Sequence, residues 1–215
     1  MAKGLRSKAT PAPRAWQRML SGRRLDLLDP SPLDIEIEDV AHGLARVARW
    51  NGQTYGDHPF SVAQHSLVVD DAVAHLRPGL EPRWRLAAVL HDAPEYVIGD
   101  MISPFKTVLG GDYKAVEARL EAAIHLRFGL PPHLPDEIKS LIKQADRISA
   151  FYEAVQLAGF APEEATRLFG KPPPGTAVQL SPLPTAEAQS RYLQRFELLA
   201  EAAGLSGSTA AFSTE

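Results

Sequence analysis

The sequence contains no cysteine in its 215 residues. This absence excludes disulfide bonds, thiol nucleophiles and zinc sites with thiolate ligands. A bound metal would therefore have to be held by histidine and carboxylate side chains. The absence is also consistent with a reducing compartment, and we expect the protein to be cytoplasmic.

Long hydrophobic runs are missing as well. No apolar stretch approaches the roughly 20 residues that a membrane-spanning helix needs, and the N-terminal residues lack the apolar segment of a secretory signal. We expect no membrane partner. With 45% apolar residues and a formal net charge of −3, the composition is typical of a globular chain whose length suits one domain.

Acidic residues are absent before Asp26, whereas basic residues are frequent there: Lys3, Arg6, Lys8, Arg14, Arg18, Arg23 and Arg24. Such an arm could contact nucleic acid or lipid headgroups, but a solvated flexible tail is the favoured explanation, and we do not expect nucleic acid as a partner. We predict a disordered basic leader over residues 1–22, a single domain over 23–204 and a flexible tail over 205–215.

The pattern of apolar residues between leader and tail predicts a mostly helical chain. An extended piece near residues 28–35 precedes the helices, and Ser61 with Gln64 fits a capping box. The predicted helices cover residues 37–50, 61–78, 82–98, 112–128, 135–157, 162–169 and 185–204. The expected fold class is all-α, a bundle of about six or seven helices.

The segment AAVLHDAPEYVIGD ends one of these helices with chemistry-bearing residues. On a helix, His91 and Glu95 would differ by about 40° of rotation and Asp92 would lie about 100° from His91. An imidazole and a neighbouring carboxylate could then share one divalent cation, with Glu95 acting on a nearby water. The alternative is a surface His-Asp pair after a core helix. Pro94 should kink or restart the helix, because it lacks an N–H and crowds the preceding turn.

Two further residues are ordinary when taken singly. His65 falls in the gap of an apolar stripe and would usually be a core histidine bonded to a carbonyl. Asp146 lies at the edge of its helix between Lys143 and Arg147, where a solvated aspartate is the usual reading.

Together these residues give an ordered set, His65, then His91-Asp92, then Asp146, on three different predicted helices. The set resembles the HD-domain metal-dependent phosphohydrolases. The segments VAQHSL, HDAPEYVIGD with the following SPFK, and IKQADRISAFYEA resemble the bacterial HD-domain 5′-deoxynucleotidases. This resemblance covers about residues 41–157 and implies an HD-domain helical bundle.

The resemblance also implies roles for individual residues. It implies Glu95 as a catalytic residue and Asp100 as the acid of a Gly-Asp element in the substrate pocket. Arg49 and Trp50 resemble a pair that contacts phosphate and sugar, although Trp50 could instead be a core aromatic. Lys106 would bind phosphate, unless it is a solvated loop lysine. The implied metal ligands are His65, His91, Asp92 and Asp146.

Two imidazoles and two carboxylates suit a divalent first-row transition metal such as Mn²⁺, Co²⁺, Fe²⁺, Ni²⁺ or Zn²⁺ better than Mg²⁺, which prefers oxygen ligands. Some HD proteins hold a second metal through additional histidines. Because His125 and His133 belong to no matching motif, we expect one metal.

The expected function is hydrolysis of nucleotides, with deoxynucleoside 5′-monophosphates giving deoxynucleoside and phosphate. A nucleoside triphosphate or another small phosphoester is an alternative substrate on the same fold. A regulatory or binding helical module with a structural metal is an alternative of another class, which the presence of Glu95 and Asp100 disfavours. The resemblance also implies a homodimer.

Overall fold

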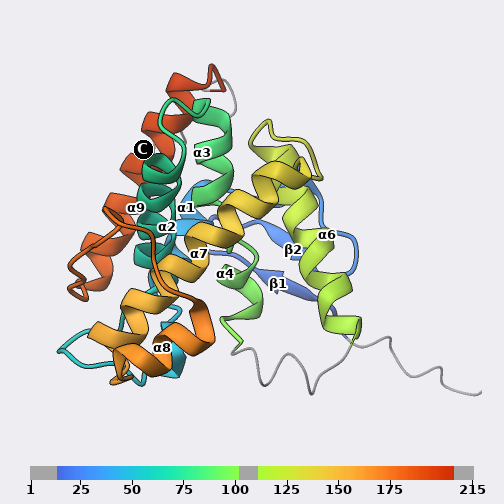
Figure 1. The fold of residues 1–215 in the computed structure, drawn as a ribbon. Helices are drawn as coiled ribbons and strands as arrows, with labels where there is room; N and C mark the ends of the chain where they lie inside the picture. Colours follow the sequence, from blue (N-terminus) through green and yellow to red (C-terminus); the bar gives the residue numbers. More distant parts are fainter. Residues whose placement is uncertain (1–13, 102–110, 206–215) are drawn as a thin grey trace, which may run out of the picture.

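The computed structural model describes residues 14–101 and 111–205 (Figure 1). Over these residues the chain is an all-α bundle of eight helices with one small hairpin, which confirms the predicted fold class. The helices are α1 (Ile37–Leu44), α2 (Val62–Leu76), α3 (Pro82–Val89), α4 (Glu95–Ile98), α6 (Gly111–Arg127), α7 (Asp136–Gln156), α8 (Pro162–Phe169) and α9 (Thr185–Ala202). Among the described residues, no helix is both long and apolar enough to cross a membrane.

The hairpin lies where the sequence predicted part of a disordered leader. Strand β1 (Trp16–Arg18) pairs antiparallel with β2 (Arg24–Asp26). The guanidinium groups of Arg14 and Arg24 lie 4.2 and 4.5 Å from the centroid of the Trp16 ring, and such cation–π contacts favour the paired strands. The predicted boundary of the leader at residue 22 therefore falls within this hairpin, between β1 and β2.

The predicted helix over residues 37–50 ends early. Helix α1 stops at Leu44, and a short 3-10 turn follows over Arg49–Gly52. Between them the chain pairs with the segment before α2: the Arg49 amide donates to the Phe60 carbonyl at 2.8 Å, and the Val62 amide to the Val47 carbonyl at 3.0 Å. This pairing between segments distant in sequence replaces the last helical turns.

Helix α2 begins as the sequence predicted, because the Ser61 side chain accepts a hydrogen bond from the Gln64 amide. The Gln64 side chain does not complete the capping box. It donates to the Ser181 carbonyl at 3.0 Å and accepts from the Leu183 amide at 2.9 Å. Gln64 therefore fixes the irregular segment that precedes α9 onto α2.

The predicted helix over residues 82–98 is divided into α3 and α4. Pro94 directly precedes α4, and the residues between the helices form tight turns in which the Ala93 amide bonds to the Leu90 carbonyl at 2.9 Å. The break expected from Pro94 is confirmed. As a consequence, His91 and Asp92 lie on a turn between two helices instead of along one helix face.

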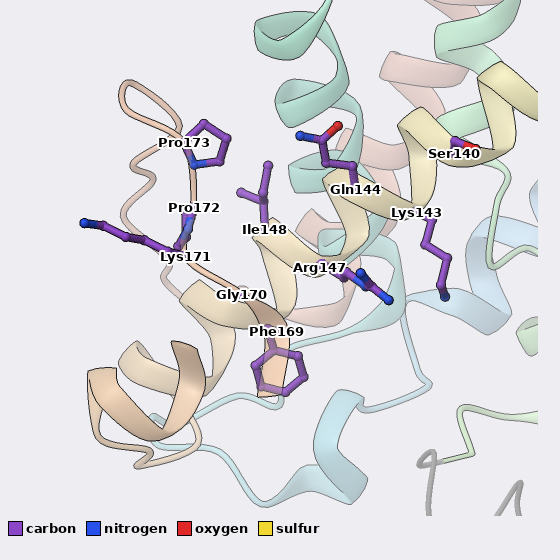
Figure 2. Close-up of a pocket in the computed structure, with 10 residues that line it drawn as sticks. All are labelled: Ser140, Lys143, Gln144, Arg147, Ile148, Phe169, Gly170, Lys171, Pro172 and Pro173. Carbon is purple, nitrogen blue, oxygen red and sulfur yellow. The ribbon is translucent and has the colours of Figure 1, made fainter. Parts of the chain in front are cut away.

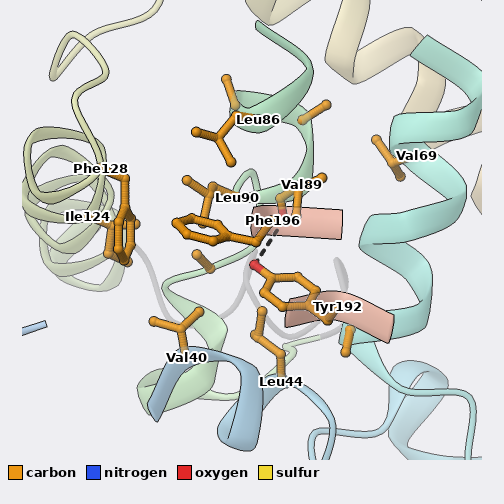
Figure 3. Close-up of a cluster of buried hydrophobic side chains, with 14 of the residues drawn as sticks. Val40, Leu44, Val69, Leu86, Val89, Leu90, Ile124, Phe128, Tyr192 and Phe196 are labelled. Atoms are coloured by element: carbon orange, nitrogen blue, oxygen red, sulfur yellow. Dashed lines mark hydrogen bonds between the residues drawn. The ribbon is translucent and has the colours of Figure 1, made fainter. Parts of the chain in front are cut away.

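Helix α2 is central to the bundle and packs against α3, α7 and α9, with α7 crossing it diagonally (Figure 1). In the core, Tyr192 and Phe196 of α9 lie beside α3 (Figure 3). Both rings are almost completely buried, and the Tyr192 hydroxyl donates to the Val89 carbonyl at 3.1 Å. This hydrogen bond fixes the end of α3 directly before the turn that carries His91.

Candidate metal centre

The side chain of His65 lies on α2 and is fully buried. Its Nε2 atom is 3.4 Å from an Asp92 carboxylate oxygen and 3.4 Å from one of Asp146 on α7. The helix crossing of α2 and α7 therefore brings together residues that are more than 80 positions apart in the sequence.

His91 is oriented by the end of α3. Its Nδ1 lies 2.8 Å from the Ala88 carbonyl oxygen, an acceptor only, so that Nδ1 carries the proton and the lone pair of Nε2 points away from α3. The Nε2 atom is 3.2 Å from an Asp92 carboxylate oxygen, and the His91 ring centroid lies 5.2 Å from that of His65.

The four predicted ligands thus converge. Potential ligand atoms of His65, His91 and Asp146 all lie within 4.8 Å of one another, and an Asp92 oxygen contacts both imidazoles. Both Nε2 atoms are buried and make no hydrogen bond within the described part of the chain. Buried polar atoms without a partner are rare, and a divalent cation would satisfy both, so the donor set fits the metal expected from the sequence.

The charges of the cluster support the same conclusion. Burial raises the pKa of Asp92, but His91 and His65 outweigh burial and hold it well below its usual range. Burial likewise raises the pKa of Asp146, but the close contact with His65 and the charges of His65 and His91 together lower it more. Both carboxylates are therefore ionised and suited to a cation.

A fifth residue, Glu153, supports the cluster from α7 and was missed by the sequence analysis. Its side chain is fully buried, and one of its oxygens lies 2.6 Å from Nδ1 of His65. Ser149 donates to the same oxygen at 2.7 Å. Glu153 follows Asp146 by seven residues, close to two helical turns, so helical spacing from a ligand was the signal that could have found it.

Arg49 and Trp50 lie against the second oxygen of Glu153. The Arg49 Nε donates to it at 3.2 Å and the Trp50 indole N–H at 2.9 Å. The Trp50 ring packs against Phe160 and Phe169, with centroid distances of 5.6 and 6.0 Å. Trp50 is thus part of an aromatic cluster, which favours a packing role for its side chain over contact with the substrate.

Asp100 also contacts Arg49. Gly99 ends α4 with a φ of 77°, a conformation that favours glycine, and the chain turns so that an Asp100 oxygen lies 3.3 Å from Nη1 of Arg49. Arg49 is therefore fixed at Nε by Glu153 and at Nη1 by Asp100, while its Nη2 makes no hydrogen bond with a residue that the structure describes.

Glu95 begins α4 and is almost completely buried. It lines a cavity of about 250 Å³ that also includes both residues of the His91-Asp92 pair. The other lining residues are Pro94, Lys114, Glu117, Ala118 and Glu121. This cavity places Glu95 beside the candidate metal centre. Lys106, the predicted phosphate-binding lysine, lies outside the described residues.

Comparison with known proteins now identifies the family. The sequence model of the YfbR-like 5′-deoxynucleotidases matches residues 39–164. The chain belongs to this YfbR-like family. It is 60% identical over 190 residues to an uncharacterized protein of Rhodobacter capsulatus, covering 86% of this chain and 96% of that protein. It is 29% identical over 168 residues to the uncharacterized protein YfdR of Escherichia coli, covering 78% and 86%.

Membership of the YfbR-like family confirms the resemblance seen in the sequence and indicates a hydrolase of the HD type. The matched residues include the four predicted ligands, Glu95, Asp100 and Glu153. The function of each of these residues remains a prediction. The structure adds that potential ligand atoms of His65, His91 and Asp146 lie within 4.8 Å of one another.

A second groove, of about 380 Å³, lies along α7 of this YfbR-like protein (Figure 2). It is lined by Ser140, Lys143, Gln144, Arg147, Ile148, Phe169, Gly170, Lys171, Pro172 and Pro173. Lys143 and Arg147 extend to the same side of α7, whereas Lys171 points away from them. No residue in the described part of the chain forms an ion pair with Lys143 or Arg147, so positive charge remains near Asp146.

Proposed function

We propose that the protein is a metal-dependent phosphohydrolase that converts deoxynucleoside 5′-monophosphates to deoxynucleosides and inorganic phosphate. The observation that carries the proposal is the convergence of two unpartnered, buried imidazole nitrogens with two ionised carboxylates. The YfbR-like family supports the phosphohydrolase class, and the choice of substrate rests on the description of that family.

His65, His91, Asp92 and Asp146 would hold one divalent first-row cation. Such an ion, when bound, lowers the pKa of water and offsets negative charge on phosphoryl oxygens. Two nitrogen and two carboxylate ligands favour Mn²⁺, Co²⁺, Fe²⁺, Ni²⁺ or Zn²⁺ over Mg²⁺.

Arg49 would bind the substrate phosphate. With Nε and Nη1 fixed by Glu153 and Asp100, the guanidinium is already oriented, and Nη2 remains for a phosphate oxygen. An oriented arginine loses little side-chain entropy when an anion binds. Lys143 and Arg147 add positive charge that would attract the anionic substrate.

Glu95 would act on the proton of the attacking water. The water oxygen forms a new bond to phosphorus while the bond from phosphorus to the 5′ oxygen breaks, and Glu95 accepts the proton that the water loses. Glu95 then gives this proton to the departing 5′ oxygen, which completes the deoxynucleoside and returns the carboxylate to its ionised state. Asp100 would act on this reaction by holding Arg49 in place.

The proposal is tested by measuring phosphate release from a panel of nucleoside mono- and triphosphates with added Mn²⁺, Co²⁺ or Mg²⁺. We expect deoxynucleoside monophosphates to be the best substrates, and Glu95→Gln to be far slower than the wild type. Glu163→Gln, which changes an exposed glutamate of α8, serves as the control and should retain full activity. Equal inactivity of the wild type and Glu95→Gln on every compound would refute the proposal.

The homodimer implied by the resemblance also remains a prediction. Light scattering of the purified protein would check it, with twice the mass of 23.4 kDa as the expected result and the mass of one chain as the contrary one.

A further inference from the structure

We propose that Glu153 is a positioning residue that couples the metal site to the phosphate-binding arginine. One of its oxygens contacts Nδ1 of His65, and the other accepts hydrogen bonds from Arg49 and Trp50. The phosphate half of this inference rests on the proposed function, whereas the metal half requires only that the cluster binds a cation.

The metal half follows from the chemistry of the imidazole. Arg49, Trp50 and Ser149 all donate hydrogen bonds to the Glu153 carboxylate, and Arg49 forms an ion pair with it. A carboxylate in this setting accepts hydrogen bonds, so the Nδ1 of His65, 2.6 Å away, donates to it. In the neutral imidazole that binds a metal, the lone pair is then on Nε2, which faces Asp92 and Asp146.

The link between Glu153 and the phosphate-binding arginine follows from the second carboxylate oxygen of Glu153. This oxygen receives the Nε–H of Arg49 at 3.2 Å and the indole N–H of Trp50 at 2.9 Å. Trp50 has a φ of 57°, a conformation that is uncommon for a bulky residue, and its hydrogen bond to Glu153 helps to hold it. Movement of the Glu153 carboxylate would therefore change the position of both groups.

Only a carboxylate fits this position. The groups around it are His65 Nδ1, Ser149 Oγ, Arg49 Nε and Trp50 Nε1. With the carboxylate ionised, each of them donates a hydrogen. A glutamine has nearly the same shape, but one of its two terminal atoms is an NH₂ group that donates hydrogens. In either orientation this NH₂ group would face other donors, which are His65 and Ser149 on one side and Arg49 and Trp50 on the other.

A purely structural ion pair is the competing explanation, and the same chain contains one. Asp70 of α2 is fully buried and binds Arg85 through two hydrogen bonds of 2.9 and 2.7 Å, and Arg195 as well. None of these contacts reaches the candidate ligands. Asp70→Asn is therefore a matched control, because it removes the charge of a buried, arginine-paired carboxylate away from the site.

The experiment measures Co²⁺ affinity of the metal-free full-length protein by titration calorimetry, inorganic phosphate affinity of the Co²⁺-saturated protein, and the free energy of unfolding. Glu153→Gln should weaken Co²⁺ binding by about 10–100-fold, the usual effect of removing a partner of a metal-bound histidine, and should also weaken phosphate binding. Arg49→Lys should weaken phosphate binding and leave Co²⁺ affinity unchanged. Asp70→Asn should lower stability alone.

Ser149→Ala provides a milder second variant if Glu153→Gln does not fold. It removes one donor to the carboxylate, and we expect a smaller loss of Co²⁺ affinity in the same direction. Unchanged Co²⁺ affinity in the variants that fold would overturn the inference. If Co²⁺ affinity falls as expected but the wild type hydrolyses no nucleotide, the proposed substrate is wrong and the metal half of the coupling stands.

Discussion

Replacement of Gly43 by alanine tests the packing that places α4, because two physical effects predict opposite changes in the free energy of unfolding. In an exposed helix, glycine to alanine stabilises by about 1 kcal/mol. Gly43, however, lies on α1 where this helix packs against α4. A methyl group there would lie 2.8 Å from both the Cβ and the carbonyl oxygen of Tyr96, and 3.1 Å from its Cα.

These contacts are far closer than the separation of about 3.5–4.0 Å at which carbon atoms attract. The opposing atoms belong to the backbone and Cβ of Tyr96, so no flexible side chain can move aside. Overpacking of this kind costs about 1–3 kcal/mol. Because backbone atoms oppose the methyl group, we expect a cost in the upper part of this range, about 2–3 kcal/mol. After subtraction of the helix-forming gain of about 1 kcal/mol, Gly43→Ala should lose about 1–2 kcal/mol of stability.

Urea unfolding followed by circular dichroism measures this difference, and a loss of 1 kcal/mol should lower the melting temperature by about 2–4 °C for a chain of this size. Because Glu95 begins α4, a displaced α4 should also reduce turnover. A Gly43→Ala protein as stable as the wild type, or more stable, would refute the packing argument.

Three other predictions follow from the structure. Tyr192→Phe removes a buried hydrogen bond to a carbonyl at the end of α3, and we expect urea unfolding to show a loss of about 1–3 kcal/mol; no loss would mean that the carbonyl finds another partner. Burial raises the pKa of Glu36, but hydrogen bonds from Arg127 and Arg23 lower it more. Its contribution to stability should therefore be complete above its ordinary pKa of 4.5 and be lost as the pH falls through the lower folded-state pKa. Glu36→Gln should show a weaker loss of stability on acidification, and a pH profile identical to the wild type would contradict the ion pair. Arg147→Glu should raise KM for a nucleotide substrate most strongly at low ionic strength, since salt screens exposed charges; a KM that does not change with salt would exclude this electrostatic effect.

The bundle could largely be predicted from the sequence because its signals are local. Helix α8 has the predicted bounds, and the Ser61 cap and the break at Pro94 each depend on neighbouring residues. The end of α1 could not be predicted in this way. It depends on pairing of residues 47–49 with residues 60–62, a contact that no helical periodicity contains.

The candidate site also has a part that could be predicted from the sequence and a part that depends on contacts between distant segments. The His91-Asp92 pair is conspicuous as a dipeptide, and with His65 and Asp146 it forms a motif that the structure brings to one point. Glu153 is not one of these four residues, although it lies in the segment IKQADRISAFYEA, and an isolated glutamate on a long helix is usually solvated. Its importance appears only when α2, α7 and the turn at Arg49 are placed together.

The central claim is that His65, His91, Asp92 and Asp146 bind one divalent metal ion. Calorimetric titration of the metal-free protein with Co²⁺ tests this claim most directly, with His91→Ala and Asp146→Asn as the variants. We predict one ion per chain in the wild type and a large loss of affinity in both variants. Co²⁺ binding of unchanged affinity and stoichiometry in both variants would contradict the assignment of the site.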